Sequence, residues 1–277
     1  MPFKTIVAIL QNERADARVL DCAIPLAQRW DSHLVGVHAE ALPVPYTSAT
    51  GFPDTEFLQV SAELNKERAE RLRSHFESRV GNTGLSHEWR SLQTFSADSA
   101  LSSLASVRAA DLIIASQNEE NSDSDADIGS LVYDAGRPVL VVPHSGPVVT
   151  NFKRIVVAWN GSREAARATF DALPFILEAE HTEILIIDAP EAEGDREADA
   201  GTDIAASLSR HGAEVSVSMA SSKGATIEDV IQQRLTDTAA DMLVLGAYSH
   251  SWLRRLIFGG VTKSVLRAGA VAAFLSR

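Results

Sequence analysis

The segment Phe3-Lys4-Thr5-Ile6-Val7-Ala8 reappears later in the chain as Phe152-Lys153-Arg154-Ile155-Val156-Val157. A second segment, Ala109-Ala110-Asp111-Leu112-Ile113-Ile114-Ala115-Ser116, returns as Ala239-Ala240-Asp241-Met242-Leu243-Val244-Leu245-Gly246. The apolar parts of these segments show no polar alternation, which is typical of strands covered on both faces of a parallel sheet. The chain therefore contains two copies of one α/β unit, and the copies can be compared position by position.

Each copy alternates apolar runs with segments of helical periodicity. Strands are predicted at 6–10, 34–38, 86–92, 111–116 and 138–142, and again at 155–159, 184–188, 214–220, 241–246 and 271–275. Five alternations of strand and helix predict a doubly wound, five-stranded, mostly parallel sheet of Rossmann-like type in each copy. We expect domains at 1–145 and 151–277, joined by a linker at 144–151 that contains Gly146 and Pro147.

The helices are predicted from the 3.6-residue period. Two are expected in the first copy at about 56–79 and 97–108, and two in the second at 199–211 and 226–238. The first strand of each copy is also followed by a helix, and Ser162 is a suitable N-cap for the second of these. Pro25 and Pro174 lie inside these two helices, where we expect a bend.

Composition limits the classes of function. The chain has 277 residues, a formal net charge of −12 and a pI near 5.1, which argues against binding to nucleic acid or to an anionic membrane. No apolar run approaches the roughly 18 residues of a membrane span, and no signal peptide is expected. Cys22 is the only cysteine, so a disulfide within one chain is excluded and a cytoplasmic location is expected. Its helical surroundings favour a buried structural thiol over a redox sensor.

Two loops carry no decisive chemistry. The segment at 41–54 contains Pro43, Pro45, Gly51 and Pro53 and is interpreted as a surface flap. In the first copy, carboxylates at 119–127 follow the fourth strand. Such a cluster can hold Mg²⁺ or Ca²⁺, but its alternation with Ser and Asn favours a solvated loop, and no metal site is predicted.

The second copy has a different segment at this place. Ligands of open parallel sheets bind beyond the carboxyl ends of the strands, where 158–162 and 246–250 should meet. Gly259-Gly260-Val261-Thr262 precedes the last helix, and a glycine pair there lets backbone amides approach an anion. Cationic residues surround it, namely Arg254, Arg255, Lys263 and Arg267. The pattern indicates a phosphate site, although the glycine pair could instead permit tight helix packing.

The spacing of these residues in the second copy resembles the motif of a known protein family. The second copy resembles the universal stress proteins, whose nucleotide-binding members carry G-x-x-G, nine residues, then G and a small hydroxyl residue. The chain has Gly246-x-x-Ser249, nine residues, then Gly259-Gly260, and the resemblance extends as a tandem pair over essentially the whole chain. It implies an adenine nucleotide alpha hydrolase-like fold and a bound ATP or AMP, with or without Mg²⁺.

The resemblance also implies positions for the ligand. The adenosine would contact the ends of the first two strands of the second copy, at Ala158, Asn160, Ile187 and Asp188. The phosphates would contact Gly246, Tyr248, Ser249, His250, Gly259, Gly260, Val261 and Thr262. Asn160 stands where relatives often have an aspartate, and its amide can still accept a hydrogen bond from a ribose hydroxyl. Ser249 in place of glycine and Gly260 in place of a hydroxyl residue should each weaken binding by about 1 kcal/mol.

The resulting hypothesis is a cytoplasmic stress-response protein that binds an adenine nucleotide in its second copy and thereby changes its conformation or partners. The first copy, where Ser116 replaces glycine, would be a degenerate partner. One alternative is a nucleotide-free interaction scaffold, and another is a slow ATPase that uses His250. We predict no catalytic residues, because the G-x-S-x-G, H-E-x-x-H and G-x-x-x-x-G-K-[ST] motifs are missing.

The expected assembly also follows from the resemblance. Single-domain relatives commonly pair through their last strands, so the strands at 139–142 and 271–274 are expected to pair within one chain as an intrachain pseudo-dimer. The sequence leaves a further homodimer open and identifies neither the partner protein nor the stress.

Overall fold

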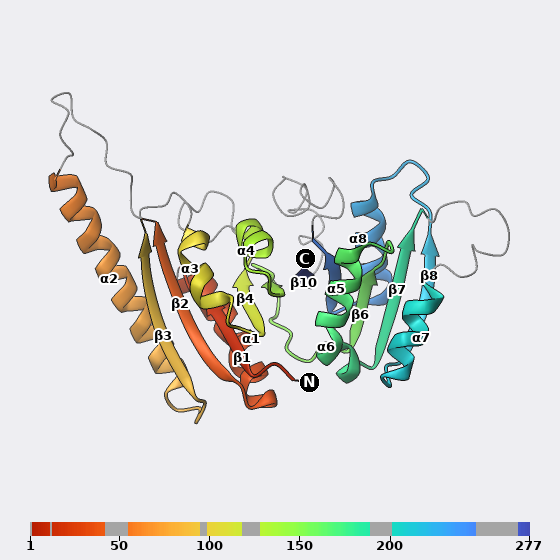
Figure 1. The fold of residues 1–277 in the computed structure, drawn as a ribbon, viewed down its shortest axis with the longest axis horizontal. Coiled ribbons are helices and arrows are strands. Elements are labelled where there is room, and N and C mark those ends of the chain that lie inside the picture. The colour runs from red at the N-terminus through yellow and green to blue at the C-terminus, as the bar shows by residue number, and fades with distance from the viewer. Residues whose placement is uncertain are drawn as a thin grey trace. The chain divides into compact units, whose positions relative to one another are not determined.

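The computed structural model describes residues 2–11, 13–41, 55–94, 99–117, 128–188, 201–247 and 271–277. The chain divides into two compact units, which are Phe3–Arg137 and Pro138–Arg277, the latter together with Met1–Pro2 (Figure 1). Both units are mostly parallel sheets with packed helices, and this confirms the predicted α/β fold class. None of the helices described is long and apolar enough to cross a membrane.

The N-terminal unit has four parallel strands in the order β3-β2-β1-β4. Helix α1 packs on β1, β2 and β4 and contacts α2, whereas α3 packs on β2 and β3 and contacts α4. The elements are β1 (Thr5–Ile9), α1 (Glu13–Trp30), β2 (His33–Ala41), α2 (Thr55–Val80), β3 (His87–Thr94), α3 (Ser99–Val107), β4 (Leu112–Ser116) and α4 (Ile128–Asp134).

The C-terminal unit has six strands in the order β5-β10-β9-β6-β7-β8, parallel except that β5 runs antiparallel to β10. Helix α5 packs on β9 and β10, α7 on β8 and α8 on β6. The elements are β5 (Val139–Val142), β6 (Arg154–Ala158), α5 (Arg163–Asp171), α6 (Leu173–Glu178), β7 (His181–Ile187), α7 (Thr202–Arg210), β8 (Val215–Ala220), α8 (Ile227–Thr238), β9 (Met242–Gly246) and β10 (Ala272–Ser276).

The repeated aspartate explains why the two quoted segments recur together. In the first copy, Asp111 Oδ2 accepts hydrogen bonds from the backbone N–H groups of Lys4 at 2.8 Å and Thr5 at 2.9 Å. In the second, Asp241 Oδ2 accepts from Lys153 at 2.8 Å and from Arg154 at 2.9 Å. Each carboxylate therefore fastens the start of one central strand to the start of the next, and both copies use this connection.

The first helices of the two copies differ in continuity. Ser162 caps α5, because its side chain accepts a hydrogen bond from Ala165 N, as the sequence predicted. That helix ends at Asp171, and α6 begins beside Pro174. A proline cannot donate the backbone hydrogen bond that would continue the helix. Helix α1, by contrast, continues through Pro25 as one helix.

The last strands of the two copies pair as expected, with Val141 opposite Ala273 and Leu140 opposite Phe274. Because of this pairing, the compact units meet between Arg137 and Pro138 and contain four and six strands instead of five and five. The repeat boundaries at 1–145 and 151–277 remain our proposal for how the chain was duplicated. Several predicted features lie outside the described residues: most of the flap at 41–54, the acidic segment at 119–127 and the glycine-rich segment beyond Ala247.

The single cysteine lies in the core of the N-terminal unit. The Cys22 side chain is 1% exposed, and burial raises the pKa of its thiol to about 12. A thiol with so high a pKa forms almost no thiolate at neutral pH. The structure therefore confirms that Cys22 is a buried structural residue.

Candidate functional site

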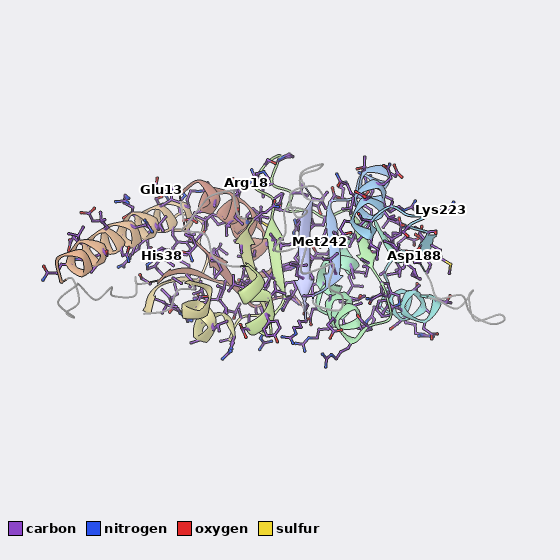
Figure 2. The ribbon with its side chains drawn as sticks, turned by 90° about the horizontal axis from the view of Figure 1, so that it is seen from above. Glu13, Arg18, His38, Asp188, Lys223 and Met242 are labelled. Carbon is purple, nitrogen blue, oxygen red and sulfur yellow. The ribbon has the colours of Figure 1, made fainter. Side chains whose placement is uncertain are left out.

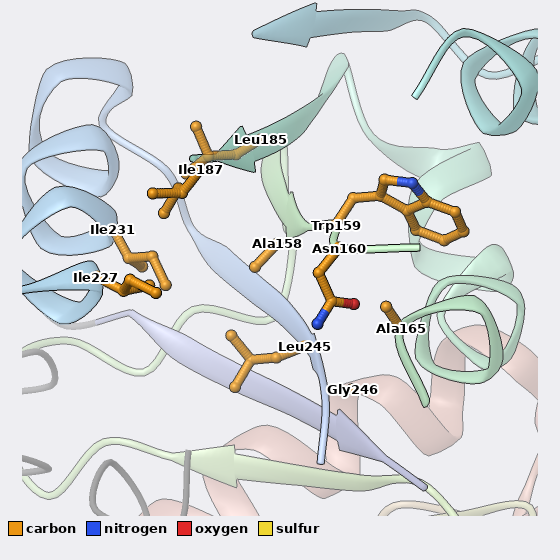
Figure 3. A pocket seen from close by; sticks show the side chains of 10 residues that line it. All are labelled: Ala158, Trp159, Asn160, Ala165, Leu185, Ile187, Ile227, Ile231, Leu245 and Gly246. Carbon is orange, nitrogen blue, oxygen red and sulfur yellow. The ribbon is translucent and has the colours of Figure 1, made fainter. Parts of the chain in front are cut away.

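A hollow opens at the carboxyl ends of β6, β7 and β9 in the C-terminal unit (Figure 3). Its empty space is about 480 Å³, part of which is open to solvent. The walls are mainly apolar. The lining residues are Ala158, Trp159, Asn160, Ala165, Leu185, Ile187, Ile227, Ile231, Leu245 and Gly246. We call this feature the C-terminal hollow.

The strand register places three of the lining residues side by side on neighbouring strands. Ala158, the last residue of β6, lies opposite both Leu185 of β7 and Leu245 of β9. Since β6 ends there, its two neighbours extend past it and leave space above its end. Helix α8 closes another side with Ile227 and Ile231, which are one helical turn apart. The start of α8 is fixed by a capping box between Thr226 and Asp229.

The backbone of Ile187 faces the space beyond β6. Asp188 N donates to Ala220 O of β8 at 2.9 Å, so the N–H and C=O of the preceding residue, Ile187, point to the opposite side. On that side the last sheet hydrogen bond runs from Trp159 N to Leu185 O at 2.8 Å. Ile187 therefore directs one backbone donor and one backbone acceptor toward the C-terminal hollow, next to its apolar walls.

Asn160 is held at the rim by the start of α5. Its Oδ1 accepts a hydrogen bond from Ser162 N at 3.1 Å, and Ser162 Oγ accepts one from Ala165 N at 3.1 Å. Figure 3 shows the Asn160 amide nitrogen turned toward Leu245 and the oxygen turned toward Ala165. The turn after β6 thus both caps the helix and orients a polar side chain.

Gly246 is required for close packing. A Cβ at this position would overlap the backbone N of Ala165 and the backbone C of Glu164, and would lie 2.7 Å from the Glu164 carbonyl oxygen. Its backbone φ is not in the left-handed region. Glycine is therefore needed here because it has no side chain, and not because of its backbone freedom. The glycine lets the first turn of α5 lie directly against the end of β9.

Glu164 lies in this first turn of α5. A side-chain hydrogen bond from Arg163 holds the pKa of the Glu164 carboxyl below its usual value.

Asp188 follows β7 but is absent from the lining of the hollow. Its backbone has φ of 50°, and its Oδ1 accepts from Ser222 N at 2.8 Å. This bond lowers the pKa of the Asp188 carboxyl below its usual value, with further hydrogen bonds from the Ser222 and Ser221 side chains. Figure 2 shows Asp188 beside the loop that carries Lys223. Asp188 fixes the connection between β8 and α8, and so positions Ile227.

Four of the residues predicted to bind the ligand line the C-terminal hollow: Ala158, Asn160, Ile187 and Gly246. Asp188 is described but does not line the hollow. The other seven lie outside the described residues: Tyr248, Ser249, His250, Gly259, Gly260, Val261 and Thr262. The prediction missed the apolar walls, which are formed by Ala165, Leu185, Ile227, Ile231 and Leu245, and it left out Trp159. The i, i+4 spacing of Ile227 and Ile231 just after a helix N-cap was a usable signal. Within the described ranges, no three His, Cys, Asp or Glu residues gather as a metal site.

The equivalent region of the first copy carries different side chains. The shared strand register makes Ile9 and Ser116 the counterparts of Ala158 and Gly246. Asp16 is the counterpart of Ala165 by the same offset in sequence that relates Ile9 to Ala158. Asp16 is 1% exposed, and its Oδ1 accepts a hydrogen bond from Gln11 N at 2.8 Å. Larger and charged groups therefore stand where the second copy has small ones.

Comparison with known proteins agrees with the duplicated fold. Residues 151–272 match the model of the universal stress protein family. A universal stress protein from Archaeoglobus fulgidus matches with a TM-score of 0.69 at 16% identity, over 99% of this chain and 96% of that one. Comparison with curated proteins found no match.

Shorter matches include two structures with bound nucleotides. A universal stress protein in complex with cAMP is 20% identical, covers 46% of this chain and 98% of its own, and has a TM-score of 0.33. An Arabidopsis thaliana family member with AMP bound is 15% identical, covers 45% and 90%, and has a TM-score of 0.30. Residues 151–272 therefore match the universal stress protein family, and the full length of the chain has the fold of a universal stress protein.

Proposed function

We propose that the second copy binds an adenine nucleotide, ATP or AMP, with its adenosine in the C-terminal hollow. Occupancy of this site changes the conformation or the partners of the protein in a stress response. The observation that carries the proposal is the Ile187 backbone, which directs one donor and one acceptor toward a space with mainly apolar walls.

Adenine matches this arrangement chemically. Its amino group donates a hydrogen bond and its ring nitrogens accept them, so one backbone N–H and one C=O can pair with the edge of the base. The faces of the ring are apolar and fit between Leu185, Ile187 and Ile231. Backbone groups that would otherwise remain unpaired against apolar walls favour a ligand that satisfies both.

The difference between the copies supports a single site in each chain. Ile9 in place of Ala158 adds bulk, and Asp16 in place of Ala165 adds a buried carboxylate that would repel an anionic ligand. The phosphates of the nucleotide, with or without Mg²⁺, would extend toward Gly246 and the segment from Tyr248 to Thr262. A cytoplasmic location, an unidentified protein partner and a further homodimer remain part of this proposal.

Thermal shift and calorimetric titration of the full chain with ATP and AMP, with and without Mg²⁺, test the proposal. Ala158→Ile introduces the residue of the first copy into the hollow and should weaken binding at least about tenfold, a loss of about 1.4 kcal/mol. Ala62→Ile makes the same change at an exposed position of α2 and should leave binding unchanged. The proposal is wrong if neither nucleotide binds, or if Ala158→Ile binds as tightly as the parent protein.

A further inference from the structure

Helices α5 and α6 carry apolar side chains on the side where a surface helix is usually polar. Phe170 of α5 is 44% exposed and Leu177 of α6 is 42% exposed. Their i, i+7 spacing places them on one side of a helix, and Pro174 between them is only partly buried. The Phe170 ring makes an edge contact with His211, with 6.4 Å between the ring centroids, and otherwise leaves much of its surface to solvent.

The two helices follow one path, although they are separate elements. Ala172 ends α5 and caps α6. Helical hydrogen bonds continue on both sides of it, because Ala172 N donates to Ala168 O at 2.9 Å and Ile176 N donates to Ala172 O at 3.1 Å. The buried residues of this path share the side opposite to Phe170 and Leu177, and they are Ala165, Ala168, Thr169, Ala172, Phe175 and Ile176. We call the side that carries Phe170 and Leu177 the outward side.

The first copy has polar residues at the same places. By the sequence offset between the copies, Asp21 of α1 is the counterpart of Phe170. Gln28 is likewise the counterpart of Leu177, and both polar residues are exposed. Asp21 Oδ1 accepts a hydrogen bond from the Arg79 side chain of α2 at 2.6 Å. The duplicated α/β unit therefore does not need apolar side chains here in order to fold.

The charges on the outward side differ between its two ends. Arg163 and Arg167 lie in α5, whereas Glu178 is the last residue of α6. Phe170 lies about midway between Arg163 and Glu178 in the sequence. Arg163 already pairs with Glu164 of its own helix at 2.8 Å, and a further carboxylate would add to this pair. A surface that is basic at one end and acidic at the other is complementary to an antiparallel copy of itself.

We propose that the outward side of α5 and α6 binds the same side of a second copy of this chain, with the two helix paths antiparallel. In this isologous contact Phe170 packs beside Phe170 of the second chain at the two-fold axis, and Arg163 lies opposite Glu178 at each end. An aromatic residue at the centre and charges at the rim are typical of protein–protein interfaces. This contact gives a surface to the homodimer named above and does not depend on nucleotide binding.

Sedimentation velocity of the full chain over a range of concentrations tests this inference, because the monomer has a mass of 29.8 kDa. The parent protein should form a dimer that dissociates on dilution. Phe170→Asp introduces the residue of the first copy and should raise the dissociation constant of the dimer at least about tenfold. Val60→Asp also replaces an exposed apolar residue, on α2, and should leave the dimer unchanged. The melting temperatures of both variants check that they fold.

Exchange of the end charges separates a contact between two chains from an effect on one helix. Arg163→Glu should weaken the dimer, because two carboxylates then face each other, although glutamate is favourable at a helix start. Addition of Glu178→Arg should restore the dimer, since the facing charges are then opposite again.

Three results would overturn this inference. They are a parent protein that stays monomeric at about 100 µM, a dimer that Phe170→Asp leaves intact, and a double charge variant that does not recover. The first of them would leave the outward side to a different protein. None of the three bears on nucleotide binding, so the proposed function stands or falls separately.

Discussion

The two copies of this chain share a strand framework and differ where their central strands end. Asp111 and Asp241 make the same pair of hydrogen bonds at the amino ends of these strands. At the carboxyl ends, the first copy has Ser116 at the position of Gly246 and Asp16 at the position of Ala165. One end of the duplicated unit therefore maintains the fold, while the other end was free to diverge in its chemistry.

Gly246 is the residue at which the difference between the two copies has the clearest effect on packing. Because its Cβ would overlap the backbone of Glu164 and Ala165, the helix that follows β6 can lie close to β9 only while this residue is glycine. A serine is present at the same place in the first copy, so the first copy accommodates a side chain at the end of β4 where the second does not at the end of β9.

The largest predicted effect comes from exchanging these two residues. Gly246→Ser forces a side chain into backbone atoms and should lower the free energy of unfolding of the C-terminal unit by about 3 kcal/mol. Ser116→Gly removes a side chain without a clash and should cost about 1 kcal/mol, through backbone entropy. Denaturant unfolding of both variants measures the two values. Equal losses in the two variants would show that the copies pack alike at this point.

The shared end of the copies should respond symmetrically. Asp111→Ala and Asp241→Ala each remove two hydrogen bonds from backbone N–H groups to a carboxylate, and each should cost about 2 kcal/mol. The same denaturant experiment, read for each variant against the parent protein, measures this loss. Asp111→Asn and Asp241→Asn keep an acceptor oxygen and serve as milder controls. A loss confined to one copy would contradict the common framework.

The smallest predicted effect concerns Asp188 at the mouth of the site. Its folded-state pKa is lowered, so its contribution to stability is complete above the pKa of the unfolded state and is lost as the pH falls through the folded-state value. Asp188→Asn should therefore lower the melting temperature slightly at pH 7, and the difference should diminish progressively as the pH falls below about 4. A difference that persists undiminished in acid would show that the carboxylate charge is irrelevant there.

Much of the fold could be predicted from the sequence, because buried parallel strands are unbroken apolar runs. Strand β9 was predicted to within one residue, and Ser162 was recognised as a helix cap. The pairing of β5 with β10 was expected from the family resemblance, but the division of the compact units between Arg137 and Pro138 was not, because it follows spatial contacts and not the repeat. The location of the expected site at the ends of β6 and β9 agrees with the C-terminal hollow.

The details of the site depended on contacts that a sequence does not display. Leu185 and Leu245 look like ordinary core residues in a strand, and only the end of β6 at Ala158 turns them into walls of a hollow. The sequence suggested that Asn160 would accept a hydrogen bond from the ligand. This stays a prediction. In the structure the same oxygen accepts a hydrogen bond from Ser162 N, which uses one of its two lone pairs.

The central claim is that one copy holds a nucleotide and the other does not. Native mass spectrometry of the full chain with a saturating adenine nucleotide counts the molecules bound to each chain directly. We predict one nucleotide per chain in the parent protein and none in Ala158→Ile under the same conditions. Zero nucleotides in the parent protein would contradict binding, and two would contradict the difference between the copies.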